Sequence, residues 1–179
     1  MNVPAAAAQA ALLQPGEDPY HGWLRLYDPT DKAAMAALGQ KIEQLGITTT
    51  FSVVMPVYNP PLDYLRQAIE SVQAQVYPHW EICIADDASP NAAVRELLNE
   101  LAAQDPRIKL VFREKNGHIS AATNSALEIA TGDYIALMDN DDLLPPHALA
   151  YMALAAHQHP QAGLIYSDED LSRDRKSVV

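Results

Sequence analysis

The sequence predicts an α/β fold in which helices cover both faces of a mostly parallel sheet. Between residues 51 and 170, short apolar runs alternate with segments whose apolar residues recur at helical spacing. The apolar run at residues 134–138 is continuous rather than alternating, which is typical of a strand buried on both faces. Strands that alternate with helices imply right-handed crossovers and parallel pairing, so these observations together predict the fold class.

The composition indicates a globular protein with an acidic surface. Hydrophobic residues make up 49% of the 179 residues, which is enough for one domain with an apolar core. The formal charge of −11 argues against a nucleic-acid partner, because a nucleic-acid surface needs a basic patch.

The cellular setting is inferred from cysteine usage and apolar runs. The single cysteine, Cys83, lies in an apolar run and is expected to be a buried, inert thiol in a reducing compartment. The sequence shows no secretory signal pattern and no apolar run of the length that spans a bilayer. We therefore expect a cytoplasmic protein, with any membrane contact peripheral and at the inner face.

Residues 1–50 are predicted to form an N-terminal arm with one helix, and residues 51–179 the sheet domain. Thr30 or Asp31 is expected to cap the helix of the arm, because side-chain oxygens at that position accept bonds from the first free N–H groups. Gly46 is expected to end it, since glycine adopts the left-handed conformation found after many helices.

Within the sheet domain, proline and turn residues mark the element boundaries. Pro60-Pro61 opens a helix that ends before Pro78, and Ser89-Pro90 is expected to cap and begin the next helix. Pro56 is expected to break the first strand. The predicted strands span residues 51–57, 80–85, 108–112, 134–138 and 163–166, and the helices residues 60–77, 89–101, 119–130 and 146–157.

An acidic cluster, Asp139-Asn140-Asp141-Asp142, follows the fourth predicted strand directly. Its three carboxylates would repel one another, and a divalent cation with a preference for oxygen ligands, Mg²⁺ or Mn²⁺, would relieve that repulsion. We predict that Asp139 and Asp141 hold such a cation and that the cation carries phosphates. The alternative is that one of these acids caps the helix that begins near Pro145 or Pro146, a role that needs only one acid.

Three strand ends carry polar side chains: Pro56-Val57-Tyr58, Asp86-Asp87 and the acidic cluster. In a parallel sheet they fall on one edge, where ligands of α/β proteins bind. Tyr58 could stack on a base, and Asp87 could accept a hydrogen bond from a base N–H or a ribose hydroxyl. Each also has an ordinary interpretation, as a packed aromatic residue and as a plain turn. Neither glycine-rich phosphate-loop motif occurs in the sequence, which argues against a dinucleotide or P-loop enzyme.

Three blocks of sequence, VVMPVYN, EICIADDAS and NGHISAATNSALEIATGDYIALMDNDDLLPP, resemble the nucleotide-binding half of inverting family 2 glycosyltransferases, which have the GT-A fold. The resemblance covers residues 51 to about 170, with the blocks in the family's order and spacing. It implies a UDP- or dTDP-linked sugar donor and a DxD motif at Asp139 and Asp141, of which Asp141 is expected to ligate the metal directly. The residues expected to contact the donor are Pro56, Val57, Tyr58, Asp86, Asp87, Asn116, Ser120, Asn124, Asp139 and Asn140.

The resemblance further implies displacement at the anomeric carbon, with inversion, by a saccharide or lipid-linked acceptor. GHISAATN and IYSDED are similar to segments of transferases that build bacterial surface polysaccharides of the rhamnan or O-antigen type. The family's general base follows the strand that corresponds to Gly163–Tyr166, so no catalytic base is assigned here, and we expect a chain truncated before the acceptor half. Thr123 stands where many relatives have arginine, which removes one positive contact to the donor.

Two other functions remain open at this point. A sugar nucleotidyltransferase shares the sheet and the acidic metal site, but a glycine-rich basic segment would be expected where this chain has Tyr58-Asn59-Pro60-Pro61. A catalytically silent donor-binding fragment would lack the acceptor half. A truncated sheet edge near Tyr166 would also expose apolar surface, which predicts self-association.

Overall fold

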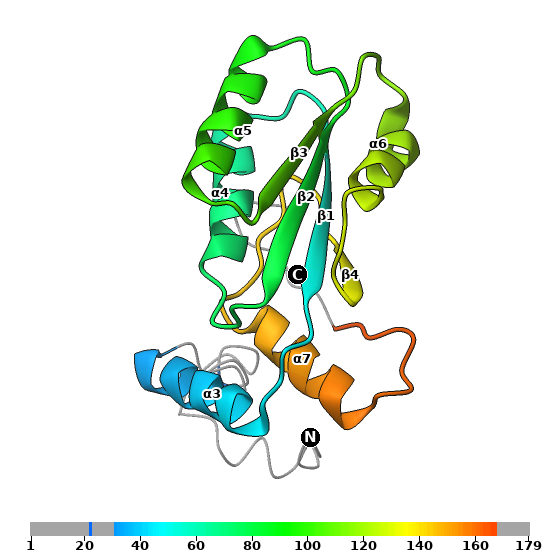
Figure 1. Ribbon diagram of the computed structural model, residues 1–179. Helices are drawn as coiled ribbons and strands as arrows, with labels where there is room; N and C mark the ends of the chain where they lie inside the picture. The colour runs from blue at the N-terminus through cyan, green and yellow to red at the C-terminus, as the bar shows by residue number, and fades with distance from the viewer. Residues whose placement is uncertain (1–21, 23–30, 168–179) are drawn as a thin grey trace.

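The computed structural model of this chain describes residue 22 and residues 31–167 (Figure 1). Its described part contains a four-stranded parallel sheet in the order β3-β2-β1-β4. The strands are β1 (Phe51–Val57), β2 (Trp80–Asp86), β3 (Ile108–Phe112) and β4 (Tyr134–Leu137). The predicted fold class is therefore confirmed.

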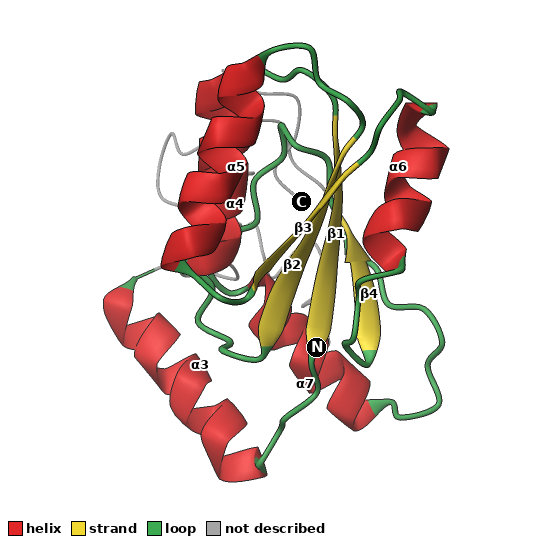
Figure 2. Cartoon of the chain, turned by 45° about the horizontal axis from the view of Figure 1, so that its top comes forward, coloured by secondary structure: helices red, strands yellow, loops and turns green. Residues whose placement is uncertain are grey.

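Helices cover both faces of this sheet, as the sequence predicted. In Figure 2, α4 (Leu62–Gln73) and α5 (Ala92–Gln104) lie on one face and α6 (His118–Leu127) on the other. Helices α3 (Lys32–Leu45) and α7 (Ala148–Gln158) contact each other beyond the amino ends of the strands (Figure 1). The carboxyl ends of the strands point the opposite way, and the candidate site lies there.

Two apolar cores hold the layers together. The larger lies under α4, α5 and α7 and includes Val53, Ile69 and Leu98, all at 0% exposure. The smaller lies under α6, which contributes only the alanines Ala122 and Ala126 and therefore sits close to the sheet. Cys83 belongs to this smaller core, where burial, and next the nearby Glu81 carboxylate, raise its pKa to about 12. The prediction of a buried, inert thiol is confirmed.

The helix of the arm begins and ends where the sequence predicts. Asp31 Oδ1 accepts hydrogen bonds from Ala33 N and Ala34 N at 2.9 and 3.0 Å. Gly46 ends the helix in the left-handed conformation, with φ of 64°. The residues before Asp31 that were assigned to the arm lie outside the described part, apart from residue 22, so the proposed domain boundary stays a prediction.

The structure corrects several element boundaries. Asn91, not Ser89, caps α5 by accepting a hydrogen bond from Ala93 N at 3.1 Å, and Ser89 instead accepts one from Asn59 N at 2.7 Å. Helix α4 ends at Gln73, well before Pro78. Helix α6 ends at Leu127, and α7 begins at Ala148 rather than near Pro146.

Pro56 does not break β1, and the sheet geometry explains why. The neighbouring carbonyl of Val54 points toward β4, where it accepts a hydrogen bond from Met138 N at 3.2 Å. Pro56 points the same way, because main-chain groups two residues apart in a strand face the same side. The missing N–H therefore faces β4, whose pairing with β1 stops at Leu137. The pairing of β1 with β2 continues past Pro56 to Val57.

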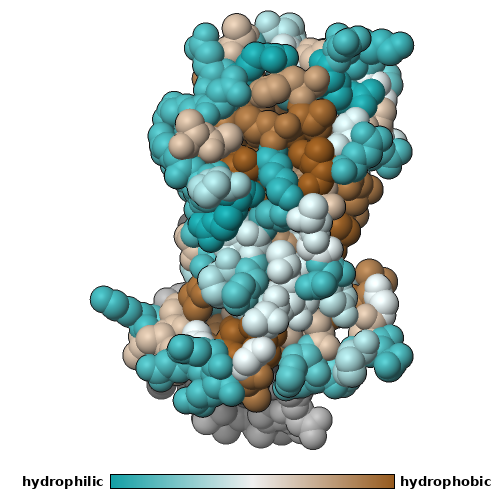
Figure 3. Space-filling view, in the orientation of Figure 1, coloured by the Kyte–Doolittle hydropathy of each residue, from teal (hydrophilic) through white to brown (hydrophobic). Residues whose placement is uncertain are grey.

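The segment 163–166, predicted as a strand, is irregular in the structure. A strand needs a neighbour for its ladder, and this segment has none among the described residues. Its Leu164 and Tyr166 are 81% and 85% exposed. Ile119, at the start of α6, and Leu137, at the end of β4, are also exposed, and Figure 3 shows apolar side chains at the surface of the molecule. Self-association through such surface stays a prediction.

No helix of the described residues has the length and apolar character to cross a membrane.

A buried carboxylate crosslinks the strands at the amino edge of the sheet. Glu81, at 8% exposure, accepts hydrogen bonds from Ser52 Oγ at 2.7 Å and Thr131 N at 2.6 Å. It also pairs with Lys109 Nζ at 2.7 Å. Burial disfavours its ionisation, but the bonds from Lys109, Thr131 and Ser52 outweigh burial and lower the pKa of Glu81 to about 2. We call Glu81 with its donors Ser52, Lys109 and Thr131 the Glu81 network.

Candidate functional site

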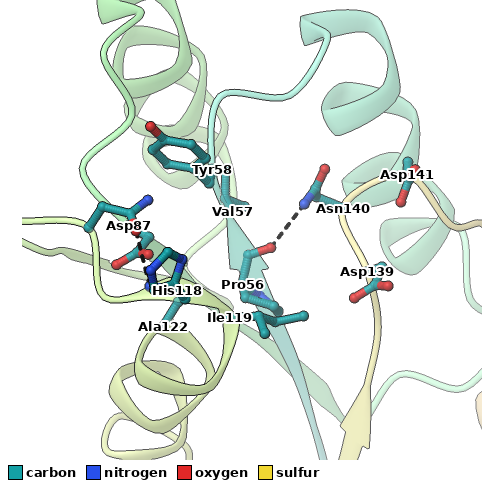
Figure 4. Close-up of a pocket in the computed structure, with 11 residues that line it drawn as sticks. Pro56, Val57, Tyr58, Asp87, His118, Ile119, Ala122, Asp139, Asn140 and Asp141 are labelled. Carbon is teal, nitrogen blue, oxygen red and sulfur yellow. Dashed lines mark hydrogen bonds between the residues drawn. The ribbon is translucent and has the colours of Figure 1, made fainter.

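The three polar strand ends meet at one cavity of about 470 Å³ on the carboxyl edge of the sheet (Figure 4). The ends of β1, β2 and β4 contribute to its wall, together with the loop before α6 and the first turns of that helix. The residues that line it are Pro56, Val57, Tyr58, Asp87, Asn116, His118, Ile119, Ala122, Asp139, Asn140 and Asp141.

Most of the predicted site residues lie at this cavity, but three do not line it. Asp86 is 2% exposed, and its Oδ2 accepts a bond from Ser89 N at 3.3 Å. Its other oxygen, Oδ1, has no hydrogen-bond partner among the described residues. Ser120 and Asn124 lie on α6 with their side chains exposed. The cavity wall that α6 does provide comes from His118, Ile119 and Ala122.

Asp87 is held rigidly at the end of β2. Arg113 Nε lies 2.7 Å from Asp87 Oδ1, and Gly117 N lies 3.0 Å from each carboxylate oxygen. The side chain of Asp87 is only 3% exposed. Charge-assisted bonds of this kind hold a carboxylate in one orientation, so Asp87 presents a defined acceptor to a ligand in the cavity.

Arg113 is the functional residue that sequence reasoning missed. It follows β3 directly, and its Nη1 also donates to Ala121 O at 3.0 Å and to Ser125 Oγ in α6. One guanidinium thus joins the ends of β2 and β3 to α6. The available signal was its position, because β3 has a polar residue at its end just as the other strands do.

Tyr58 forms the rim of the cavity opposite the acidic cluster (Figure 4). The residue is 53% exposed, so its ring is accessible from outside the protein. The following residue, Asn59, donates from its backbone N to Ser89 Oγ at 2.7 Å. This bond ties the loop after β1 to the loop after β2, so the positions of Tyr58 and Asp87 are coupled.

Three residues other than glycine adopt left-handed backbone conformations, and all three lie close in sequence to residues that line this cavity. Asn59, Ala88 and His118 have φ of 47°, 60° and 64°. Left-handed geometry is unfavourable for residues with a Cβ, and such strain concentrates at functional sites. The backbone turns sharply at each of these points, which directs Tyr58, Asp87 and the start of α6 toward the cavity.

The acidic cluster occupies the end of β4. Burial, together with the charges of Asp142 and Asp141, raises the pKa of Asp139 above its ordinary value. Asn140 Nδ2 donates to Pro56 O at 3.1 Å, which anchors the cluster to β1. The helix-cap alternative is wrong, because His147, and not one of these acids, stands at the N-cap of α7.

The donor set of the cluster fits a cation that takes part of its coordination from a ligand. In the described part of the chain, no group of three His, Cys, Asp or Glu side chains is close enough to hold a metal ion alone. Mg²⁺ and similar ions are commonly held by one or two carboxylates together with phosphate oxygens and water. Asp139 and Asp141 provide two carboxylates beside an open cavity, which matches that pattern.

Comparison with known proteins identifies relatives of this chain. The family model "Glycosyl transferase family 2" matches residues 52–174. An uncharacterized protein, y4gI, from Sinorhizobium fredii is 48% identical over 84% of this chain, which corresponds to 17% of that protein. The O-antigen biosynthesis protein RfbC from Myxococcus xanthus is 33% identical over 84% of this chain and 12% of its own length. The chain therefore spans less than a fifth of either relative.

Solved structures share the fold. The structure of residues 1–349 of TarS from S. aureus in complex with UDP-GlcNAc matches with a TM-score of 0.57 at 23% identity, over 67% of this chain and 39% of that one. The mannosyltransferase PcManGT from Pyrobaculum calidifontis, in complex with GDP-Man and Mn²⁺, matches with a TM-score of 0.51 at 22% identity, over 66% and 39%. At these identities the likeness establishes the fold alone.

Proposed function

Because the chain belongs to glycosyl transferase family 2, we propose that it binds a nucleoside-diphosphate sugar at the carboxyl edge of its sheet. The observation that carries this proposal is the single cavity that unites Tyr58 and Asp87 with Asp139 and Asp141. One end of the cavity has an aromatic ring and a hydrogen-bond acceptor, and the other end has carboxylates. A nucleotide sugar needs both, because its base is aromatic and its diphosphate is anionic.

The nucleoside end is formed by Tyr58 and Asp87. Tyr58 stacks on the base, and Asp87 accepts a hydrogen bond from a base N–H or a ribose hydroxyl. Arg113 and Gly117 hold the Asp87 carboxylate in place for this contact. A UDP- or dTDP-linked donor fits this arrangement, since both bases carry an N–H between two carbonyl groups.

The diphosphate end is formed by Asp139 and Asp141, which hold Mg²⁺ or Mn²⁺. When bound, the cation neutralises charge on the diphosphate as it departs from the sugar. The cation also lets an acidic site accept an anionic ligand, because the described lining of the cavity includes no lysine or arginine. Ile119 and the first turn of α6 line the cavity, and the N-terminus of this helix favours a negative group.

The reaction we propose for the whole protein is transfer of the sugar, with inversion, to a saccharide or lipid-linked acceptor. Support for a role in surface-polysaccharide synthesis comes from the relative named as an O-antigen biosynthesis protein. Support for the donor class comes from fold neighbours solved with UDP-GlcNAc and with GDP-Man and Mn²⁺. The acids Asp168, Glu169 and Asp170, which belong to the segment IYSDED, lie outside the described residues, and no general base is assigned.

The test is calorimetric titration of UDP and dTDP into the native chain, with Mn²⁺ and with EDTA. The matched pair of variants is Asp141→Ala, which removes a cation ligand, and Glu96→Ala, which removes an exposed acid from α5. We expect Mn²⁺ to strengthen UDP binding in the native chain and in Glu96→Ala. Asp141→Ala is expected to lose that enhancement.

Each outcome selects among the possible functions. Enhancement by Mn²⁺ that Asp141→Ala abolishes supports the donor site, and hydrolysis or transfer of the donor sugar then separates an active transferase from a silent binding fragment. If the folded native chain binds neither nucleotide under any of these conditions, the donor-site proposal fails. If Mn²⁺ strengthened UDP binding equally in Asp141→Ala and Glu96→Ala, the proposed cation site at Asp141 would be refuted.

A further inference from the structure

A buried glutamine joins α4 to the segment that follows the acidic cluster. Gln75 lies just beyond the C-cap of α4 and is 8% exposed. Its Nε2 donates to Pro145 O at 2.8 Å and to Leu144 O at 3.4 Å. Its Oε1 accepts a hydrogen bond from Leu149 N at 3.0 Å. These partners lie between 69 and 74 positions further along the chain, so one side chain connects two distant segments.

Two neighbours of Gln75 strengthen this connection. Ser71 Oγ accepts a hydrogen bond from Leu144 N at 3.1 Å, and Val76 N donates to Pro146 O at 2.8 Å. Pro145 and Pro146 have no N–H, so this segment can make fewer backbone hydrogen bonds of its own. Within it, Ala148 N donates to Pro145 O at 2.9 Å. Ser71, Gln75 and Val76, which we call the α4 clamp, supply the further contacts to Leu144, Pro145, Pro146 and Leu149.

The acidic cluster lies between the α4 clamp and a second anchor on β1. Met138 N donates to Val54 O at 3.2 Å, and Asn140 Nδ2 donates to Pro56 O at 3.1 Å. On the other side of the cluster, Leu144 is held by the clamp through both its carbonyl group and its N–H. The like charges in the loop repel one another, so the loop spreads unless both of its ends are held.

We propose that Gln75 is a positioning residue for the divalent-cation site at Asp139 and Asp141. This inference rests on the proposed function. Gln75 contacts neither carboxylate and acts through the backbone of Leu144 and Pro145. Tyr58 and Asp87, on the opposite side of the cavity, are held by other contacts. The part of nucleotide binding that needs the cation therefore depends on Gln75, whereas the part that does not need the cation is independent of it.

The chain offers a matched control in Gln73, the last residue of α4. Its Nε2 donates to Asp105 Oδ2 at 3.2 Å, away from the acidic loop. We compare Gln75→Leu with Gln73→Leu in UDP titrations with Mn²⁺ and with EDTA. Gln75→Leu is expected to weaken Mn²⁺-dependent binding by about tenfold or more, as loss of contacts that orient metal ligands commonly does. Binding in EDTA should stay within about twofold of the native chain.

If Gln75→Leu lost as much UDP affinity in EDTA as in Mn²⁺, the positioning role would be overturned. It would also be overturned if Gln73→Leu lost as much UDP affinity as Gln75→Leu. Backbone amide exchange, measured on the same proteins without nucleotide or metal, tests the clamp separately. Faster exchange at residues 139–149 in Gln75→Leu but not in Gln73→Leu is expected, and unchanged exchange refutes the clamp. If the native chain binds no UDP, the proposed function fails on that result, and amide exchange alone decides whether Gln75 orders the acidic loop.

Discussion

The Glu81 network makes a quantitative prediction about stability and pH. Glu81→Gln preserves the shape of the side chain but replaces one carboxylate oxygen with an NH₂ group that faces other donors. The lowered pKa of Glu81, about 2 against an ordinary value of 4.5, measures how strongly the fold favours the ionised form. At about 1.4 kcal/mol per pH unit, this difference corresponds to a contribution of about 3 kcal/mol at neutral pH.

The sign of the pH dependence follows from the direction of the shift. A group whose pKa is lower in the folded state stabilises the fold fully above its unfolded pKa. That stabilisation is lost as the pH falls toward the folded value. The difference in unfolding free energy between the native chain and Glu81→Gln should therefore be about 3 kcal/mol at pH 7 and shrink as the pH falls from about 4.5 toward about 2.

Urea unfolding followed by circular dichroism, from about pH 7 to about pH 3, measures this difference. Asp105, whose pKa is also lowered to about 2 by its Arg107 partner, contributes equally to both proteins and cancels. Glu100→Gln is the control, because its pair with Arg66 is exposed and such pairs contribute at most about 1 kcal/mol. A loss that does not vary with pH, or a loss no larger than that of the control, would refute this account of Glu81.

Two further predictions concern the cavity and the amino edge. Arg113→Met leaves the buried Asp87 carboxylate without its charged partner, so we expect the unfolding free energy to fall by about 3 kcal/mol and UDP affinity to fall about tenfold. Arg66→Met is the control. Calorimetry that finds the two variants equal would contradict the role of Arg113. Gly132→Ala places a Cβ 2.7 Å from Thr50 O and 2.8 Å from Ser52 N. We expect a loss of about 1–3 kcal/mol in urea unfolding, against almost none for Gly163→Ala, where a Cβ meets nothing within 4 Å; equal stability of the two would show that the backbone moves aside.

The convergence of the site residues was predictable because the topology requires it. Once the chain alternates strands and helices, parallel strands must place Tyr58, Asp87 and Asp139 on the same edge. The helix ends at Asp31 and Gly46 were predictable for a similar reason, since their chemistry acts within a few residues of sequence. These predictions needed no knowledge of distant contacts.

The predictions that failed, and the residues that were missed, depend on contacts between distant segments. Ser89 and Asn91 are both good capping residues, and the choice between them depends on Asn59, which recruits the Ser89 hydroxyl from 30 positions away. Arg113 resembles an ordinary surface charge until the fold places it beside Asp87. Gln75 gives no local signal of its contact with Leu144. The apolar run at 163–166 resembles a strand, but a strand also needs a neighbour.

The left-handed residues Asn59, Ala88 and His118 restrict which sequences can build this rim. Such a backbone accepts glycine or asparagine readily but excludes proline and disfavours branched side chains. Each of the three follows directly after a residue of the cavity wall or of the Asp87 contacts. Substitution of the neighbouring side chains can therefore change which ligand such a site selects, whereas the left-handed positions themselves accept only a few residue types.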